Sequence, residues 1–169
     1  FNGNVGQLAA IGELGVTGNV LIGASVNEEA PLTIAINARA IDFGGNVVLE
    51  SAAALVGTEH VMFGGSIDGG YDLAVSTGDT LTFSSSIGST DALLSIAVDA
   101  DNLWLGGSYD SDNPEPSQYL PMSINTVGNI SFGSEEYQGT PSLSTIAAMG
   151  DLAISSQEGS ISFSSHEKL

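Results

Sequence analysis

The chain has 169 residues, with 20 Asp and Glu against 2 Lys and Arg, so its formal net charge at pH 7 is −18. So few basic side chains exclude binding to nucleic-acid phosphates or to an anionic membrane surface, and the absence of cysteine excludes disulfides, thiolate metal sites and a cysteine nucleophile. Hydrophobic residues make up 42% of the sequence, too many for a disordered acidic segment, yet none of their runs is long enough to insert across a bilayer. We therefore expect one acidic domain over residues 1–169.

The sequence opens at Phe1 inside a recurring pattern, without an initiator Met or a signal-like leader, so we expect a processed product or a segment of a longer repeat protein. The pattern is an apolar residue, any residue, an aromatic or aliphatic residue, two small residues, any residue and an apolar residue. After a partial copy at residues 1–5, copies begin at residues 20, 41, 61, 81, 103, 130 and 161. The first spacings are 20 to 22 residues, and insertions lengthen the last two to 27 and 31.

Each copy alternates apolar with small or polar residues, and β-branched, Leu or aromatic side chains hold the apolar positions, which is typical of a β-strand. A second alternating segment lies between the copies, at residues 14–16, 34–36, 73–75, 96–98, 122–124 and 152–154, with a poorer match at 54–56. Gly, Asn or Asp turn residues follow these segments. The best helical candidate is residues 144–149, which could form one or two turns at most.

Strands repeated at this spacing suit two architectures. In a β-hairpin array each strand pairs with its neighbour in sequence, whereas in a β-solenoid it pairs with its counterpart one repeat later, so that equivalent positions stack. The third position of the pattern carries an aromatic or aliphatic residue in every copy: Phe1, Ile22, Phe43, Phe63, Phe83, Leu105, Phe132 and Phe163. The sequence therefore favours an all-β, parallel β-helix of about eight coils, with a core ladder of Phe43, Phe63, Phe83 and Phe132. A hairpin-based sandwich or propeller is the alternative.

Residues 71–98 resemble the repeats of large secreted bacterial adhesins of the filamentous-haemagglutinin type. The resemblance is carried by Leu73–Val75, the turn at Gly78, the alternating segment Leu81–Ile87 and the segment Leu94–Val98. It covers nearly the whole chain except for the insertions after Tyr109 and after residue 133. It implies a right-handed parallel β-helix, a hand that agrees with the general rule for parallel crossovers, displayed on or shed from a bacterial cell surface. It brings no catalytic residues.

The insertion after Tyr109 contains oxygen-bearing side chains that could hold a cation. Asp110, Asp112 and Glu115 could supply several of the six to eight oxygens that Ca²⁺ takes. The loop lacks the turn Gly and the closing Glu of an EF-hand, and the glycine-aspartate nonapeptide of calcium-binding β-rolls is absent. A solvated insertion is therefore the alternative, and we expect no required cofactor, with calcium as the candidate ion.

Trp104 and Tyr109 point outward in the alternation and could form a patch that contacts a glycan or a protein partner. The alternative function is thus a carbohydrate-binding or carbohydrate-cleaving β-helix domain, similar to a tail-spike, with its site at the insertions 109–120 and 133–150 beside Trp104. The adjacent carboxylates Glu135 and Glu136 would point to opposite faces of a strand, which disfavours a glycosidase pair. We expect that the protein is not an enzyme.

Neither end of the predicted stack carries a capping helix. Phe1 and Val5 lie in the pattern at one end, and Ile161 and Phe163 form a strand at the other. Open strand edges recruit further strands. Together with the resemblance to secreted bacterial adhesins, these edges predict a structural module of a bacterial extracellular fibre, surface layer or adhesin. Its expected partners are copies of itself joined end to end and, in second place, glycans or a host surface.

Overall fold

The computed structural model describes residues 1, 3–23, 33–106, 122–132, 145–148 and 152–163. These residues form fifteen β-strands and no helix. Every strand pair among them is parallel. The prediction of an all-β chain is confirmed over these ranges, and the hairpin alternative is wrong for them because no described pair is antiparallel.

The largest sheet has ten strands and consists of two halves that share β3 (Ile34–Phe43) and β5 (Ala53–Phe63). Half A continues from the first part of β5 through β7 (Asp72–Thr77), β9 (Ser95–Asp99), β12 (Ile130–Phe132) and β15 (Ile161–Phe163). Half B begins with β1 (Ile11–Val16) and continues from the second part of β5 through β8 (Thr80–Phe83), β10 (Asn102–Leu105) and β13 (Thr145–Ala148). The register shifts between Ala38 and Ala40, where β3 passes from one half to the other.

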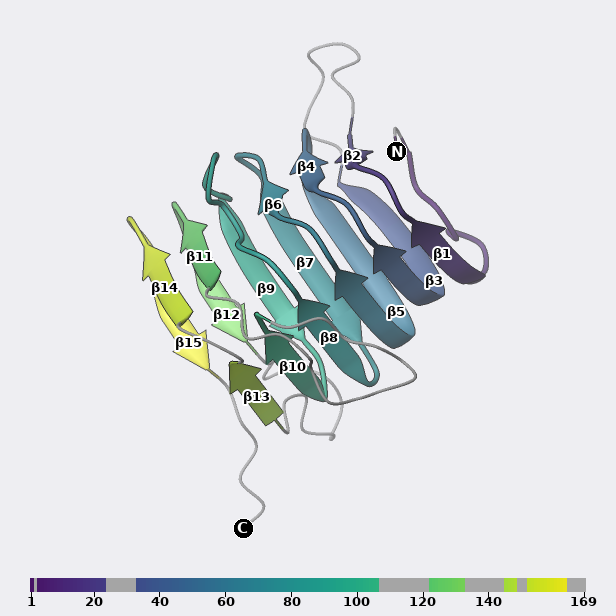
Figure 1. The fold of residues 1–169 in the computed structure, drawn as a ribbon. Helices are drawn as coiled ribbons and strands as arrows, with labels where there is room; N and C mark the ends of the chain where they lie inside the picture. The colour runs from purple at the N-terminus through teal and green to yellow at the C-terminus, as the bar shows by residue number, and fades with distance from the viewer. Residues whose placement is uncertain (2, 24–32, 107–121, 133–144, 149–151, 164–169) are drawn as a thin grey trace.

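The remaining strands form a third side, which we call side C. It contains β2 (Val20–Ile22), β4 (Val47–Leu49) and β6 (Ile67–Asp68), followed by β11 (Met122–Thr126) and β14 (Leu152–Ser156). Isolated bridges from Ile67 to Ile87 and from Ile87 to Ile124 connect the two groups. The chain passes through half A, half B and side C in turn and returns to half A beside its earlier strand (Figure 1). We call one such passage a circuit, and the position of each circuit in the stack a level.

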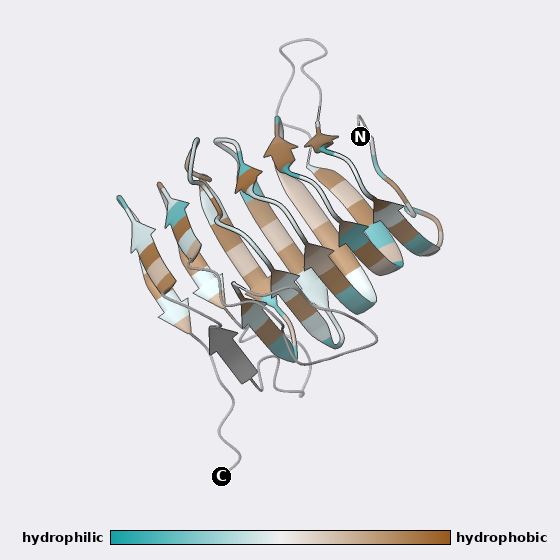
Figure 2. Cartoon of the chain, in the orientation of Figure 1, coloured by the Kyte–Doolittle hydropathy of each residue, from teal (hydrophilic) through white to brown (hydrophobic). Residues whose placement is uncertain are grey.

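Alternation along the strands turns every second side chain into the space between the three sides. Figure 2 shows the resulting apolar bands, which cross neighbouring strands at the same height. Phe43, Phe63 and Phe83 are Cα partners on successive levels of half B, and all three are fully buried. Their ring centroids lie 5.8 Å and 5.2 Å apart, and such aromatic pairs add roughly 0.5–1.5 kcal/mol beyond their buried area. We call such a column of Cα partners on successive levels a file. The phenylalanine file also fixes the pairing register of the strands, because a slip by one residue would turn each ring outward.

Several residues occupy a different side from the one that repeat spacing suggests. Phe132, expected in the file of Phe83, lies in half A, where its Cα partners are Val98 and Phe163. Val20, expected beside the first position of the next copy, pairs with Val47 on side C. All three sides share the same apolar–x–apolar alternation, so sequence distance alone does not identify the side once an insertion lengthens a circuit. The helical candidate at 144–149 is also wrong, since residues 145–148 pair with β10 as strand β13.

The bend between half B and side C brings neighbouring levels into close backbone contact. A Cβ built on Gly65 would lie 2.5 Å from the carbonyl carbon of Gly45 and 2.6 Å from Asn46 N, so only glycine fits there. Asparagine side chains bond across the same bend: Asn19 Oδ1 accepts from Asn46 N, and Asn46 Oδ1 accepts from Ser66 N, both at 3.1 Å. Glycine and asparagine thus hold successive levels together where the strands stop.

Candidate functional site

The predicted cation ligands Asp110, Asp112 and Glu115, and the predicted contact residue Tyr109, lie outside the described residues. Within the described ranges, no three His, Asp or Glu side chains come together as a metal site. The same ranges contain no helix with the length and hydropathy needed to cross a membrane. Calcium binding therefore stays a prediction of the sequence.

Trp104 lies in β10 between the buried residues Leu103 and Leu105, so the alternation turns its side chain outward from half B. Its Cα partner is Thr82 of β8, whose side chain is almost completely buried although it belongs to the same outward file. Trp104 itself is half-buried. A single aromatic side chain is normal on a protein surface. Because Tyr109 is not among the described residues, β10 positions one member of the expected patch, Trp104.

Arg39 connects three successive levels near the bend between the two halves of the large sheet. Its Nη2 lies 2.8 Å from Glu13 Oε1, and its Nη1 lies 3.0 Å from Glu59 Oε1. Close by, His60 Nε2 lies 3.1 Å from Asp42 Oδ1. Exposed ion pairs of this kind contribute about 0.2–1 kcal/mol each. Because Arg39 is held by two carboxylates, the described residues offer no unpaired Lys or Arg to an anionic substrate.

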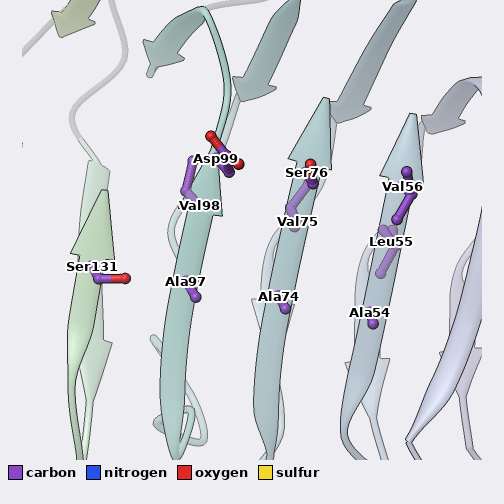
Figure 3. Close-up of a pocket in the computed structure, with 10 residues that line it drawn as sticks. All are labelled: Ala54, Leu55, Val56, Ala74, Val75, Ser76, Ala97, Val98, Asp99 and Ser131. Atoms are coloured by element: carbon purple, nitrogen blue, oxygen red, sulfur yellow. The ribbon is translucent and has the colours of Figure 1, made fainter. Parts of the chain in front are cut away.

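A shallow hollow of about 190 Å³ lies on the outer face of half A. Ala54, Ala74 and Ala97 form its floor on β5, β7 and β9, and Asp99 is the only charged residue of its lining (Figure 3). The small side chains leave the hollow open and nearly uncharged. Its lining offers mostly apolar contact, with the hydroxyls of Ser76 and Ser131 and without a histidine, so its composition suits a contact surface.

A wider hollow of about 530 Å³ crosses the bend between side C and half A, where Val48 and Tyr71 provide apolar surface beside three carboxylates. One of these, Asp68, is already engaged: its Oδ1 accepts from Thr90 N at 2.7 Å and its Oδ2 from Ser66 Oγ at 3.1 Å. Asp68 thereby holds the turn of the next level. The other two carboxylates, Glu50 and Asp91, are exposed to solvent.

The last described level exposes side chains that point into the stack. Ile161 and Phe163 of β15 are 42% and 54% exposed, whereas Ile130 and Phe132, one level earlier in the same files, are 0% exposed. The Phe132 and Phe163 rings are stacked, with centroids 5.1 Å apart. We call β14 and β15 together the C-terminal face.

The first level shows the same incomplete burial. Val5 and Val16 are half-buried, whereas their Cα partners Ile36 and Phe43 are fully buried. Phe1 lies beside side C: its amino group donates to Leu21 O, and its C=O accepts from Gly23 N. Its ring lies 6.4 Å from that of Phe43, although the two do not belong to one side. We call Val5, β1 and β2 together the N-terminal face.

Comparisons with known proteins identify no relative: no family model, no curated protein and no solved structure matches this chain. The candidate site is therefore built from the described residues. Among them, the two terminal faces combine exposed apolar side chains with strand edges, and they are the candidate functional site.

Proposed function

We propose that this chain is a non-enzymatic structural module of a bacterial extracellular fibre, surface layer or adhesin. In this proposal the circuits are the coils of a right-handed parallel β-helix, which copies of the chain or neighbouring segments extend end to end. The observation that carries the proposal is the exposure of Ile161 and Phe163 at the C-terminal face, where a further level would bury them as it buries Ile130 and Phe132. Residue pattern and resemblance, rather than a matched relative, support the bacterial surface as its location.

The register of the strands supports this architecture. Half B orders β1, β3, β5, β8, β10 and β13 as parallel neighbours, and β15 begins a further level in half A. We therefore propose six coils and the start of a seventh, in place of the eight expected from motif copies. Each level packs on the level before and after it, so the architecture sets no limit on length and adding a level repeats existing contacts.

The acidic surface is compatible with such a stack. Two like charges 4 Å apart repel by about 1 kcal/mol in water. Carboxylates are therefore better placed beside hydrogen-bond donors than beside carboxylates of the adjacent level. Ser95 Oγ donates to Asp72 Oδ1 at 2.5 Å, and Asp79 Oδ1 accepts from Thr80 Oγ1 at 3.2 Å and from Asn102 Nδ2 at 3.4 Å. Hydroxyl and amide donors on the same or the next level thus stabilise acids within the ladder.

Negative-stain microscopy over a concentration series tests the proposed function. We expect particles of constant width whose length increases with protein concentration, because each junction buries the same side chains. Light scattering after size exclusion should show the same series of masses in solution. Short particles of uniform length and monomeric mass at every concentration would contradict the proposal.

A second candidate function, glycan binding, is supported by the outward placement of Trp104 on half B. An indole on an outer face can stack on the apolar face of a sugar ring, and its N–H can donate a hydrogen bond. A glycan array tests this function: binding that is lost in Trp104→Ala and retained in Leu21→Ala, an exposed apolar residue of side C, would support it. Binding that both variants retain would exclude Trp104 as the contact.

A further inference from the structure

We infer that copies of this chain join head to tail, so that β15 of one copy pairs in parallel with residues 3–6 of the next copy. The inference rests on the proposed function and adds the partner, the polarity and the register of the junction. Three features support it: the order of the three sides, the side chains at the terminal faces, and the direction of the backbone groups at both edges.

The order of the three sides allows half A to continue from one copy to the next in one polarity. Half A, half B and side C follow one another in the same order on every level. When β15 of one copy pairs with residues 3–6 of another, half A continues onto its own counterpart. On side C, Phe1 already lies on the outer edge of β2, and half B ends one level before half A, at β13. Two C-terminal faces related by a two-fold axis could match at most one side with itself, because half B would then meet side C. A head-to-tail contact is heterologous and does not close, so it produces a filament.

The apolar files lack a neighbour at both faces. In half A, the file that contains Ile36 begins at Val5 and ends at Phe163, and both end residues are more exposed than Ile36. On side C, Leu152 and Ile154 of β14 are likewise only half-buried. A second copy placed head to tail gives Val5 and Phe163 the contact that their file provides on every interior level.

At the C-terminal face, the backbone of β15 points toward a further strand. Alternate residues of a strand in a parallel ladder bond to opposite neighbours. Ile130 N donates to Ser160 O at 2.9 Å, so Ser160 and Ser162 direct their backbone groups toward β12. Ile161 and Phe163 therefore direct theirs to the opposite edge.

At the N-terminal face the alternation is complementary. Val5 N donates to Ala35 O at 2.8 Å, and Val5 O accepts from Asn37 N at 2.9 Å, so both groups of Val5 are used toward β3. Asn4 and Gly6 direct their backbone groups to the other edge. The register that continues the half A file puts Phe163 opposite Val5. Phe163 N–H then donates to Asn4 C=O, and Gly6 N–H donates to Phe163 C=O.

Ionic strength should control this junction. Each copy carries a formal charge of −18, so joining two copies brings like charges together. Salt shortens the range of that repulsion, from about 30 Å at 0.01 M to about 10 Å at 0.1 M. We therefore expect the number of junctions to increase with salt concentration.

Engineered cysteines test the polarity and register, because the chain contains no cysteine of its own. The register places the outward residue Ser162 beside Asn4 of the next copy. Neighbouring strands lie ~4.8 Å apart, within the Cα separation of about 4.4–6.8 Å that a disulfide spans. We would mix Asn4→Cys protein with Ser162→Cys protein, oxidise mildly, and measure disulfide-linked dimers on non-reducing gels. The matched control replaces Ser162→Cys with Ser131→Cys, which lies in the same outward file one level earlier.

The mixed dimer should exceed the control several-fold and increase with salt. A dominant Ser162→Cys homodimer would overturn the inference in favour of a two-fold junction. Long particles without a mixed dimer above the control would also overturn it, while leaving the proposed function intact. Monomers at every salt concentration, with native circular dichroism, would overturn both.

A second pair of variants keeps the test independent of cysteine placement. Phe163→Asp puts a charge in the proposed junction, whereas Ser131→Asp puts the same charge on the outer face of half A. Phe163→Asp should reduce particle length to that of single copies, and Ser131→Asp should leave it unchanged. Equal lengths for the two variants would exclude β15 from the junction.

Discussion

Replacing Gly65 with Ala tests how closely the levels approach at the bend between half B and side C. The added Cβ would lie 2.5 Å from both the carbonyl carbon of Gly45 and Asn46 Oδ1. The backbone cannot yield easily, because the strand ladders on either side hold the levels ~4.8 Å apart. The asparagine side chain could move, but it would then lose its 3.1 Å bond from Ser66 N.

The magnitude follows from these two effects. Overpacking at a well-packed position costs about 1–3 kcal/mol, and the lost hydrogen bond costs about 1 kcal/mol. We therefore expect Gly65→Ala to lower the free energy of unfolding by about 2–4 kcal/mol, a large part of the roughly 5–15 kcal/mol typical of a domain. At about 2–4 °C per kcal/mol for a chain of this length, Tm should decrease by about 5–15 °C.

Urea denaturation and thermal melting followed by circular dichroism measure this loss. The control is Gly18→Ala, since a Cβ built on Gly18 has no heavy atom within 4 Å, and it should change the free energy of unfolding by less than about 0.5 kcal/mol. If the free energy of unfolding of Gly65→Ala lies within about 0.5 kcal/mol of the control's, the levels do not approach as closely as described, and the explanation of this bend is refuted.

Three further substitutions test the core and the ion pairs. Phe63→Ala should lower the free energy of unfolding by about 3–5 kcal/mol because it opens a cavity between two buried rings. Phe163→Ala should lower it by about 1 kcal/mol or less, since the Phe163 ring is half exposed. Equal losses for the two variants in urea titrations would contradict the difference in burial. Arg39→Met removes two exposed ion pairs and should cost about 0.5–2 kcal/mol at low salt. That loss should shrink in about 0.5 M NaCl, and a loss independent of salt would show that the Arg39 stem acts through packing.

The strands and the stacking of Phe43, Phe63 and Phe83 follow from local patterns. Period-2 alternation identifies a strand from a few residues, and a regular spacing of 20 residues between these three positions brings the rings onto successive levels. No long-range information is needed as long as no insertion intervenes. This is why the prediction of strand type and parallel pairing succeeded in the middle of the chain.

The side occupied by each strand could not be predicted in the same way. Val20 and Phe132 match the pattern of Phe43 and its neighbours, yet they lie on side C and in half A. Each side of the stack needs only alternating apolar residues, so the three sides share one pattern. The insertions after residues 109 and 133, and the longer connection from β2 to β3, change the number of residues between successive levels.

The interactions of single side chains also depend on that register. Arg39 meets Glu13 and Glu59, which are 26 and 20 residues away in sequence. The unequal separations arise because the earlier circuit contains the longer connection. The sequence also could not predict that the backbone groups of Asn4 and Gly6 face away from β3. Their direction follows from the hydrogen bonds that Val5 makes to β3 rather than from residue type.

The central claim is that circuits of the chain lie on one another in parallel register, and contacts among three phenylalanine rings test it most directly. Nuclear Overhauser effects in a sample with labelled Phe rings would measure these contacts in solution. The account predicts cross-peaks from Phe63 to both Phe43 and Phe83, whose centroids lie 5.8 Å and 5.2 Å away. Cross-peaks from Phe63 only to residues of its own circuit, with none to the other two rings, would contradict it.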